Sequence, residues 1–455
     1  MSVADLAGVA AGTRWETAPV GARERIVDVV ADCLAVTALG STRAELSLLV
    51  ASYEHWAGNG RATVVGSARR WPPGTAALLN GCALAADQLQ DGHRLARGHP
   101  GSHVVPAVLA LAEATDAEGS ELLSAVLAGY EVGVRLGRAM GGTPEGVHDI
   151  GTWGEVAAAV GVARLLAPNR PEVMHRAIEL AASTVLATDA DSVFTGASGS
   201  HLFLGVSAQL GLSAGTAAVS GLAAAPDSVD RHFGARAAAD WRPELLTAGV
   251  SAGTWSEYEV LGGYLKRHPT CAHLHGVNDA VEDLIAGGLR AADVSTIEVS
   301  VSASVIRFAP VADGELAARF SIPTSVAVAV VSGRLDETSF DAATVRTPAV
   351  RDLARRVRVG HDPALDAGYP AGRPATVRVV LRDGSARTAT TARPRGDADR
   401  WPSRDVVADK VIRLLGRRFG DRAAGIAAAI QGLAEGGRPR QLGDLLRTAA
   451  QDCPR

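Results

Sequence analysis

Apolar side chains in the first half of the chain recur at helical spacing. Between residues 23 and 40 the positions of one helix face fall three or four residues apart, at Ile26, Val29, Val30, Cys33 and Thr37. Similar apolar runs predict helices over 103–114 and 120–140, and Ser120 is placed to cap the second of them. This half of the chain is therefore predicted to be helical.

The helix start near residue 152 has its own sequence pattern. Thr152 and Glu155 have the spacing of a capping box, in which each side chain bonds the backbone N–H of the other residue. The apolar run 156–166 that follows stops before Pro168, which cannot continue a helix. We predict a helix that begins directly after Thr152.

The pattern changes after about residue 263. Apolar residues alternate at two-residue spacing in 294–301 and again in 377–381, which is strand periodicity. The second stretch runs into Asp383-Gly384, a pair typical of tight hairpin turns. One helical segment, at 273–285, precedes the first strand and another, at 323–331, lies between the two strands, so we predict an α+β domain over 263–400.

Helical spacing returns at the C-terminal end. Ser403 is placed as an N-cap, and the helix after it has one apolar face, formed by Val407, Val411, Leu414 and Leu415. We expect residues 401–455 to pack back on the first helical region, 1–262. The predicted fold is mainly α with α+β: a large, discontinuous all-helical domain and a smaller α+β lid domain.

Composition narrows the class of protein. The chain has 455 residues, which suggests two or three domains, and 47% hydrophobic residues, which is enough for sizeable cores. Its net charge is −4 and its aromatic content is 4%. Both values argue against a nucleic-acid partner, which calls for basic patches and aromatic stacking platforms.

The sequence also argues against a secreted or membrane protein. The first 16 residues lack a basic segment followed by an apolar core, so we expect no signal peptide. Residues 198–226 have no charged side chain but are rich in Gly, Ser and Ala, which favours buried core helices over a membrane span. No C-x-x-C pair occurs among Cys33, Cys82, Cys271 and Cys453. We therefore expect a reduced, cytoplasmic protein.

The densest polar cluster lies in residues 80–106, where a loop opens an apolar helix at His99-Pro100. Backbone N–H groups at a helix start favour anionic ligands, and histidines exchange protons near neutral pH. The alternative is a polar surface loop with ordinary capping residues. The candidate residues in this cluster are Asp87, Asp91, His93, Arg94, Arg97, His99 and His103.

A second cluster spans residues 266–275, where the helical half meets the mixed region. Clefts between domains are common ligand sites, and Lys266 can hold a carboxylate or carbonyl oxygen as a point charge. Cys271, His273 and His275 also suggest a metal site or a nucleophilic cysteine. We predict neither, because no second pair of ligands or His-Glu-x-x-His motif is present and buried cysteines are usually inert.

Two further observations concern a third candidate histidine and the common catalytic motifs. His148, just before the helix predicted at Thr152, is a third candidate, although an isolated histidine is more often structural. The sequence has no Walker A loop, no strand-linked G-x-G-x-x-G and no G-x-S-x-G elbow. This argues against nucleotide, dinucleotide and α/β-hydrolase chemistry.

Taken in order, these segments resemble the MmgE/PrpD family over nearly the whole chain. The resemblance implies a helical domain interrupted by an α+β lid, a homodimer, and chemistry that uses no metal or other cofactor. The segments that carry it are 75–81, 91–93, 99–102, 105–107, 128–132, His148 with 151–154, Lys266, 268–269, Cys271, His275, 279–280, 320–321 and 325–327.

The resemblance also implies which residues form the site. The positions that match the family's catalytic residues are His99, His148 and Lys266. The positions that match its substrate contacts are Gln88, Asp91, Gly92, His93, Ser200, Cys271 and His275.

This chain departs from the family pattern at several of these positions. The family's Leu-Asp-Phe-Asp-Asp-Thr run places its first two aspartates at Gln88 and Gln90, so only the third is retained, as Asp91, and Gly92 takes the place of the threonine. A family lysine falls on Ser200. The missing carboxylate and cation argue against the family's tricarboxylate substrates. Arg94 and Arg97 are candidates for a different anion contact.

Three functions are compatible with this pattern. The first is a lyase that dehydrates or decarboxylates a small carboxylic acid or related polar metabolite, with histidine and lysine assisting proton transfer. The second is an isomerase, an epimerase or a cyclisation-type enzyme that uses the same proton transfer. The third is a catalytically silent homologue kept for binding or assembly, because fold does not fix function.

Overall fold

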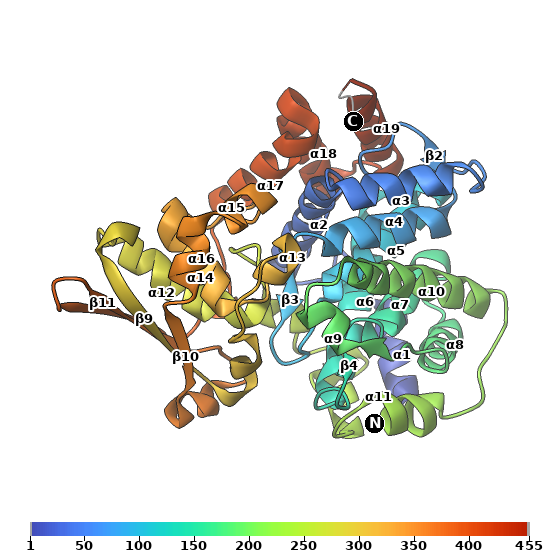
Figure 1. Cartoon of the computed structure of the whole chain (residues 1–455). Helices are drawn as coiled ribbons and strands as arrows, with labels where there is room; N and C mark the ends of the chain where they lie inside the picture. Colours follow the sequence, from blue (N-terminus) through green and yellow to red (C-terminus); the bar gives the residue numbers. More distant parts are fainter. Residues whose placement is uncertain (1, 453–455) are drawn as a thin grey trace.

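The computed structural model describes residues 2–452, and these form two bodies with separate hydrophobic cores (Figure 1). The larger core takes residues from 6–265 and again from 407–450. The second core takes Val193 and residues from 271–381. The predicted fold class is confirmed: a large helical domain made from two stretches of chain lies beside a smaller α+β domain. The boundaries at 263 and 400 stay a prediction.

The helical domain contains the first eleven helices that the described residues form. They are α1 (Val3–Gly12), α2 (Val20–Gly40), α3 (Ala44–Glu54), α4 (Pro73–Ala85), α5 (Pro100–Thr115), α6 (Gly119–Ala139), α7 (Trp153–Leu166), α8 (Pro171–Ala182), α9 (Ala190–Phe194), α10 (His201–Val219) and α11 (Ala235–Ala237). Short antiparallel strand pairs connect them: β1 (Ala62–Thr63) with β2 (Arg70–Trp71), β3 (Gly92–His93) with β8 (Gly263–Tyr264), β4 (Val147–His148) with β5 (Thr188–Asp189), and β6 (Val250–Ser251) with β7 (Thr254–Trp255).

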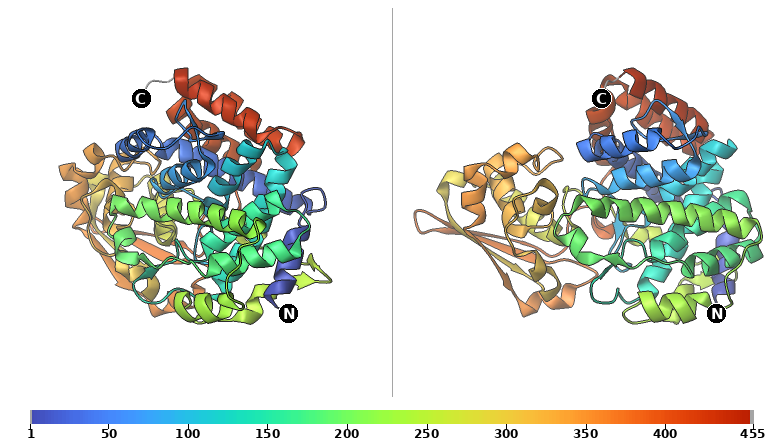
Figure 2. Two further views of the ribbon diagram at one scale, coloured as in Figure 1. Left: turned by 90° about the vertical axis from the view of Figure 1, so that its right-hand side faces the viewer. Right: turned by 45° about the vertical axis from the view of Figure 1, so that its right-hand side comes forward.

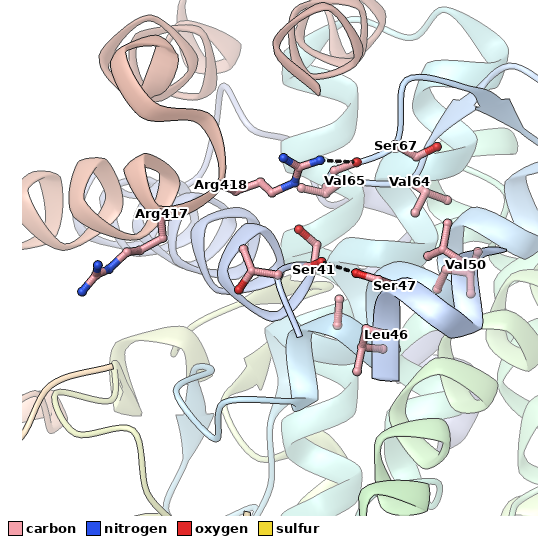
Figure 3. A pocket seen from close by; sticks show the side chains of 13 residues that line it. Ser41, Leu46, Ser47, Val50, Val64, Val65, Ser67, Arg417 and Arg418 are labelled. Atoms are coloured by element: carbon pink, nitrogen blue, oxygen red, sulfur yellow. Dashed lines mark hydrogen bonds between the residues drawn. The ribbon is translucent and has the colours of Figure 1, made fainter. Parts of the chain in front are cut away.

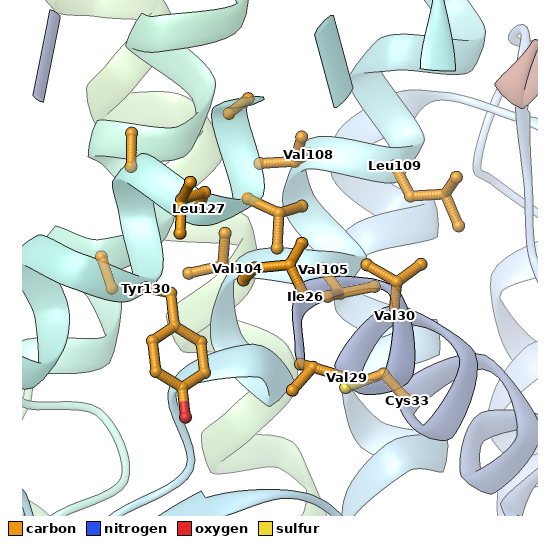
Figure 4. Packing of buried hydrophobic residues seen from close by; sticks show 14 of the residues in the cluster. Ile26, Val29, Val30, Cys33, Val104, Val105, Val108, Leu109, Leu127 and Tyr130 are labelled. Atoms are coloured by element: carbon orange, nitrogen blue, oxygen red, sulfur yellow. The ribbon is translucent and has the colours of Figure 1, made fainter. Parts of the chain in front are cut away.

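Helices α2, α5 and α6 pack together through the faces that the helical spacing predicts (Figure 4). The side chains in contact are almost fully buried, and each Val, Leu or Ile among them stabilises the fold by about 1.5–3 kcal/mol. The apolar face of α2 contacts an apolar face of α5, and apolar side chains of α6 lie against both. The residues drawn are Ile26, Val29, Val30, Cys33, Val104, Val105, Val108, Leu109, Leu127 and Tyr130.

Helix α10 packs closely on α4 because two glycines face each other. A Cβ added at Gly81 would lie 2.8 Å from the Cα of Gly205, so the two backbones touch. By length and composition alone the charge-free segment Ser198–Val219 could cross a membrane, but half of its apolar window is buried inside the fold. Its contacts with α4, α7 and α8 are those of a core helix.

The α+β domain has one four-stranded sheet, in the order β10 (Val357–His361), β9 (Val294–Val301), β11 (Ala375–Leu381), β12 (Ala386–Thr391). Strand β9 pairs in parallel with β10 and antiparallel with β11, and β11 forms the predicted hairpin with β12. Alternate residues of β9 and β11 are buried, as the two-residue spacing predicts. The helices of this domain are α12 (His275–Ala286), α13 (Glu315–Ala318), α14 (Ile322–Ser332), α15 (Ala342–Val345) and α16 (Pro348–Ala354).

The last three helices return to the helical domain: α17 (Arg404–Phe419), α18 (Ala423–Gln431) and α19 (Pro439–Asp452). Both views of Figure 2 show them beside the N-terminal helices, and α17 packs directly on α2. The Ser403 side chain accepts from the Val406 amide, so the predicted N-cap is confirmed. The predicted apolar face of α17, which includes Val407 and Leu414, is buried.

Of two other predicted caps, Ser120 is wrong, and Thr152 is confirmed as the N-cap residue but without its capping box. Ser120 lies inside α6, because Glu118 takes the N-cap position, where Arg438 pairs with its carboxylate. Thr152 does precede α7, but its hydroxyl donates to the Asp149 carbonyl, and Glu155 accepts from Thr184 instead of closing a capping box. Glu118 and Glu121 form the local capping box of α6, whereas at α7 the Thr184 hydroxyl takes the carboxylate of Glu155.

Candidate active site

The loop between α4 and α5 is held at the domain boundary by ion pairs. Asp87, whose side chain is fully buried, pairs with Arg43 of the helical domain and with Arg319 of the α+β domain. Further along the loop, Arg94 Nη2 lies 2.6 Å from Asp397 Oδ1. The pairs fix the first polar cluster between the two domains. Because Arg94 is already paired with Asp397, it is not free to serve as the anion contact that the sequence suggested.

His99 ends this loop as the N-cap residue of α5. Its Nδ1 lies 2.6 Å from the Asp91 carbonyl oxygen, and a carbonyl can only accept, so Nδ1 carries the proton. The lone pair of neutral His99 is therefore on Nε2. Burial, and next the charge of Lys266, hold the pKa of His99 well below its usual value. His99 is thus a neutral base in this environment.

Asp91 supports His99 and the helix behind it. Its carboxylate accepts from the Gly101 amide at 2.9 Å, from the Ser102 amide at 3.0 Å and from the Ser102 hydroxyl at 2.8 Å. Burial raises the pKa of Asp91 to about 6 in spite of these bonds. The helix-start amides that the sequence offered to an anionic ligand are occupied by this carboxylate, so that expectation is wrong.

Lys266 is fully buried next to the same loop. Its Nζ donates to the Gln88 carbonyl at 3.0 Å and to Gln90 Oε1 at 3.3 Å. Neither acceptor is charged, and burial lowers the pKa of Lys266 to about 7. The backbone of Gln88, at φ 52°, turns its carbonyl toward the lysine, while its side chain donates to Ala85. Because Gln90 stands where the resemblance expects an acid, the amine lacks a carboxylate that would keep it charged.

This arrangement predicts a pH effect of one substitution. With Lys266 acting as a cation, the rate should fall as pH rises through about 7, where the amine loses its proton. Gln90→Glu places a carboxylate beside Nζ and favours the charged form. We expect the descending limb of the kcat/KM profile to move up by at least about one pH unit, a change of about 1.4 kcal/mol. Gln90→Met is the control, and a limb at the same pH in Gln90→Glu would contradict the assignment.

A cavity of about 390 Å³ opens between the domains beside this cluster. It is lined by His148 and Asp149 of the helical domain and by His273, Arg307 and Tyr369 of the α+β domain. The Ile150 amide donates to His148 Nδ1 at 3.1 Å, so neutral His148 has its proton on Nε2. In these tautomers Nε2 of His148 is a hydrogen-bond donor, whereas Nε2 of His99 is an acceptor.

The three residues predicted to be catalytic do not all line this cavity. His148 lines it, whereas Lys266 borders a separate cavity beside α17 and His99 borders neither. The predicted common lining is therefore not observed, because the Gln88 carbonyl and Gln90 hold the lysine inward. The three still lie within electrostatic reach, since the charges of Lys266 and His148 both lower the pKa of His99.

The remaining predicted contacts divide into two groups. Cys271 and His275 belong to the cluster: Cys271 Sγ lies 3.5 Å from His273 Nδ1, and the His275 Nε2 is buried without a partner. Away from it, His93 faces Glu259 at 3.8 Å, and Gly92 packs against the Tyr264 ring. Ser200 is buried at the start of α10. Burial lowers the pKa of His93 to about 3, as for a structural histidine.

Sequence reasoning missed several residues of the site. Asp149 adjoins His148, so proximity would have found it, and His273 was considered only as a metal ligand. Arg307, in the 3-10 helix Ala303–Phe308, and Tyr369, in a turn, belong to no recognisable motif. Arg373 is 5% exposed, and its charge lowers the pKa values of Lys266, His273 and His275. No spacing in the sequence indicates it.

One group of described residues has the geometry of a metal site. Candidate ligand atoms of His268, Asp279 and Glu282 lie within 4.8 Å of one another. Arginines occupy this group instead: Arg395 lies 3.2 Å and Arg267 2.9 Å from Glu282 Oε2. We expect elemental analysis of active protein to find no stoichiometric zinc, iron or manganese. Activity that is lost on chelation and restored by one of these metals would refute this.

A further cavity, of about 240 Å³, lies between α2, α3, α4 and α17 (Figure 3). Its walls carry serines, aliphatic side chains and the arginines Arg417 and Arg418, of which Arg418 donates to the Gly66 carbonyl. No histidine, acid or cysteine lines it. It offers no side chain suited to proton transfer.

Comparison with known proteins agrees with this two-domain picture. The MmgE/PrpD N-terminal domain model matches residues 4–241, and the MmgE/PrpD C-terminal domain model matches residues 268–435. Cis-aconitate decarboxylase from Aspergillus terreus (strain NIH 2624 / FGSC A1156) is 25% identical over 376 residues, 76% of each chain. The proteins of the same name from Mus musculus and Homo sapiens are both 26% identical, over 84% and 80% of this chain and 80% and 77% of their own lengths. The chain belongs to the MmgE/PrpD family.

Proposed function

We propose that this protein is a lyase that removes water or carbon dioxide from a small carboxylic acid by proton transfer, without a metal or other cofactor. The observation that carries the proposal is the complementary pair of histidines at the domain boundary. The fixed tautomer of His99 leaves a free lone pair on Nε2, and that of His148 leaves an N–H on Nε2. One imidazole can take a proton while the other delivers one.

Lys266 supplies the third element of the mechanism. A proton removed next to a carboxylate or carbonyl leaves an enolate-like charge, and a buried cation stabilises that charge strongly. Below pH 7 the amine of Lys266 is in its charged form, because its pKa is about 7. His99, with its pKa far below the usual value, is neutral and ready to accept under the same conditions.

An isomerase or epimerase is the second candidate, because it needs the same proton transfer without loss of a group. Incubation of candidate acids with the protein in D₂O separates the two. Elimination or decarboxylation product supports the lyase, whereas deuterium in recovered substrate without product supports the isomerase. A protein that gives neither result with any of a broad panel of carboxylic acids would be the catalytically silent homologue.

The substrate is expected to differ from those of the named relatives. We predict that cis-aconitate and 2-methylcitrate are turned over poorly, because Ser200 and Gln88 replace a cation and an acid of the family pattern. Loss of one buried charge contact costs roughly 2–5 kcal/mol, about 30-fold to several thousand-fold in rate. Assays with both acids test this directly, and turnover at the level of dedicated enzymes would contradict it.

The assembly and location of the protein stay predictions. We expect a homodimer in the cytoplasm, acting on a small anion, with no nucleic-acid or membrane partner. Light scattering of the purified protein measures the first of these.

A further inference from the structure

Arg373 is a buried guanidinium without a carboxylate partner. It lies in the loop that leads into β11, it is 5% exposed, and its Nε has no hydrogen-bond partner. Within residues 2–452 no acid pairs with it, whereas the other buried arginine of the cleft, Arg94, is paired with Asp397. Burial is the main cause that lowers the pKa of Arg373.

Arg373 does not itself line the interdomain cavity, but it lies four positions after Tyr369, which does. Its charge acts on Asp149 and His273, which line the interdomain cavity, and on Lys266 behind them. Tyr369, another cavity residue, lies within its electrostatic range. Its backbone is fixed, because a Cβ at Gly276 of α12 would lie 2.2 Å from the Arg373 carbonyl oxygen. The guanidinium therefore extends from a rigid anchor.

The cavity has an excess of unpaired positive charge. Arg97 and Arg307 line it without an ion pair among the described residues, and they rest on the rings of Tyr369 and Phe194 at 5.5 and 4.6 Å. The one acid in the lining, Asp149, has its Oδ1 3.2 Å from His148 Nδ1, which is an ion pair only when His148 is protonated, and burial raises the pKa of Asp149, which favours its neutral form. Arg307 is exposed and Arg97 is half-buried, so water solvates both charges, whereas the charge of Arg373 is buried. An unpaired buried charge is costly, and a ligand of opposite charge would offset that cost.

We propose that Arg373 is a specificity-determining residue of this site and that its guanidinium binds a carboxylate group of the substrate, which enters past Arg97 and Arg307. The inference rests on the proposed function, because it names a residue that recognises the same substrate. A guanidinium binds a carboxylate through two parallel hydrogen bonds, which gives it preference for carboxylates over neutral amides. This contact would stand in for the cation that is missing at Ser200.

The experiment compares wild-type protein, Arg373→Gln and a matched control, Arg358→Gln, which changes an exposed arginine of the same domain. Binding of acetate, succinate, cis-aconitate and the amide succinamate is measured by calorimetry. We expect the affinity of the tightest-binding carboxylate to fall at least about 30-fold in Arg373→Gln. The affinity of succinamate should fall by less, because its amide end is neutral. Arg358→Gln should bind like wild type.

Thermal melting separates binding from a structural role. Removal of an unpaired buried charge should leave the melting temperature of the ligand-free Arg373→Gln protein unchanged or raise it. A lower melting temperature together with equal loss of all ligands would overturn the proposal. Carboxylate affinity within threefold of wild type, or no carboxylate binding to wild type, would also overturn it.

The outcomes also distinguish this inference from the proposed function. Carboxylate binding that depends on Arg373, without turnover or deuterium exchange, would refute the lyase and isomerase but support the binding residue. Turnover with a KM that does not change in Arg373→Gln would support the enzyme and refute the role of Arg373.

Discussion

Replacement of His99 by alanine is expected to lower kcat/KM by about 100-fold or more, as loss of a general base usually does. The fold should persist, because the imidazole makes one described hydrogen bond, to the Asp91 carbonyl, and such a bond contributes about 1 kcal/mol. Lys266→Ala should lose a similar factor through the missing charge stabilisation. Steady-state kinetics with the substrate found in the D₂O assay measures both effects.

His175→Ala is a suitable control for these variants, because His175 is a half-buried histidine of α8 that lines neither cavity of the site. Its activity should match that of wild type, and circular dichroism should be the same for all three variants. A rate within threefold of wild type in His99→Ala would show that another group takes the proton.

Asp91→Ala is expected to destabilise the protein by about 3 kcal/mol or more. Two backbone amides and one hydroxyl at the start of α5 lose their acceptor, and each buried unpaired donor costs about 1–3 kcal/mol. Activity should fall as well, since the Asp91 backbone orients His99. Urea unfolding followed by circular dichroism measures the change in free energy.

Asp91→Asn tests the cause of this loss. It keeps one acceptor oxygen and the shape of the side chain, so its stability should lie between those of wild type and Asp91→Ala. A loss below about 1 kcal/mol in the alanine variant would mean that water satisfies the amides of Gly101 and Ser102.

Patterns that depend on neighbouring residues were readable from the sequence. The helical face of α2 and the alternation in β9 follow from the 3.6- and two-residue periods, and Ser403 bonds an amide three positions away. The fold class followed from these periods and from the family resemblance together.

Features that depend on distant partners were not readable. Asp91 fills the helix start from ten residues before it, and the Thr184 hydroxyl binds the Glu155 carboxylate from 29 residues away. Arg373 was missed because its importance lies in lacking a partner, and only three-dimensional contacts reveal which arginines are paired. Arg94 and Arg97 looked alike in sequence, yet one is held by Asp397 and the other is unpaired.

The return of α17 to α2 has a consequence for synthesis of the chain. A ribosome delivers the N-terminus first, and domains generally fold as units during translation. Here α4, α5 and α6 can cover α2 early, but the part of α2 that packs on α17 stays uncovered until α17 emerges, after the whole α+β domain has been made. The nascent helical domain thus waits with part of its apolar surface exposed for the length of one complete domain, and the α+β domain, whose core apart from Val193 comes from residues 271–381, is the unit able to finish first.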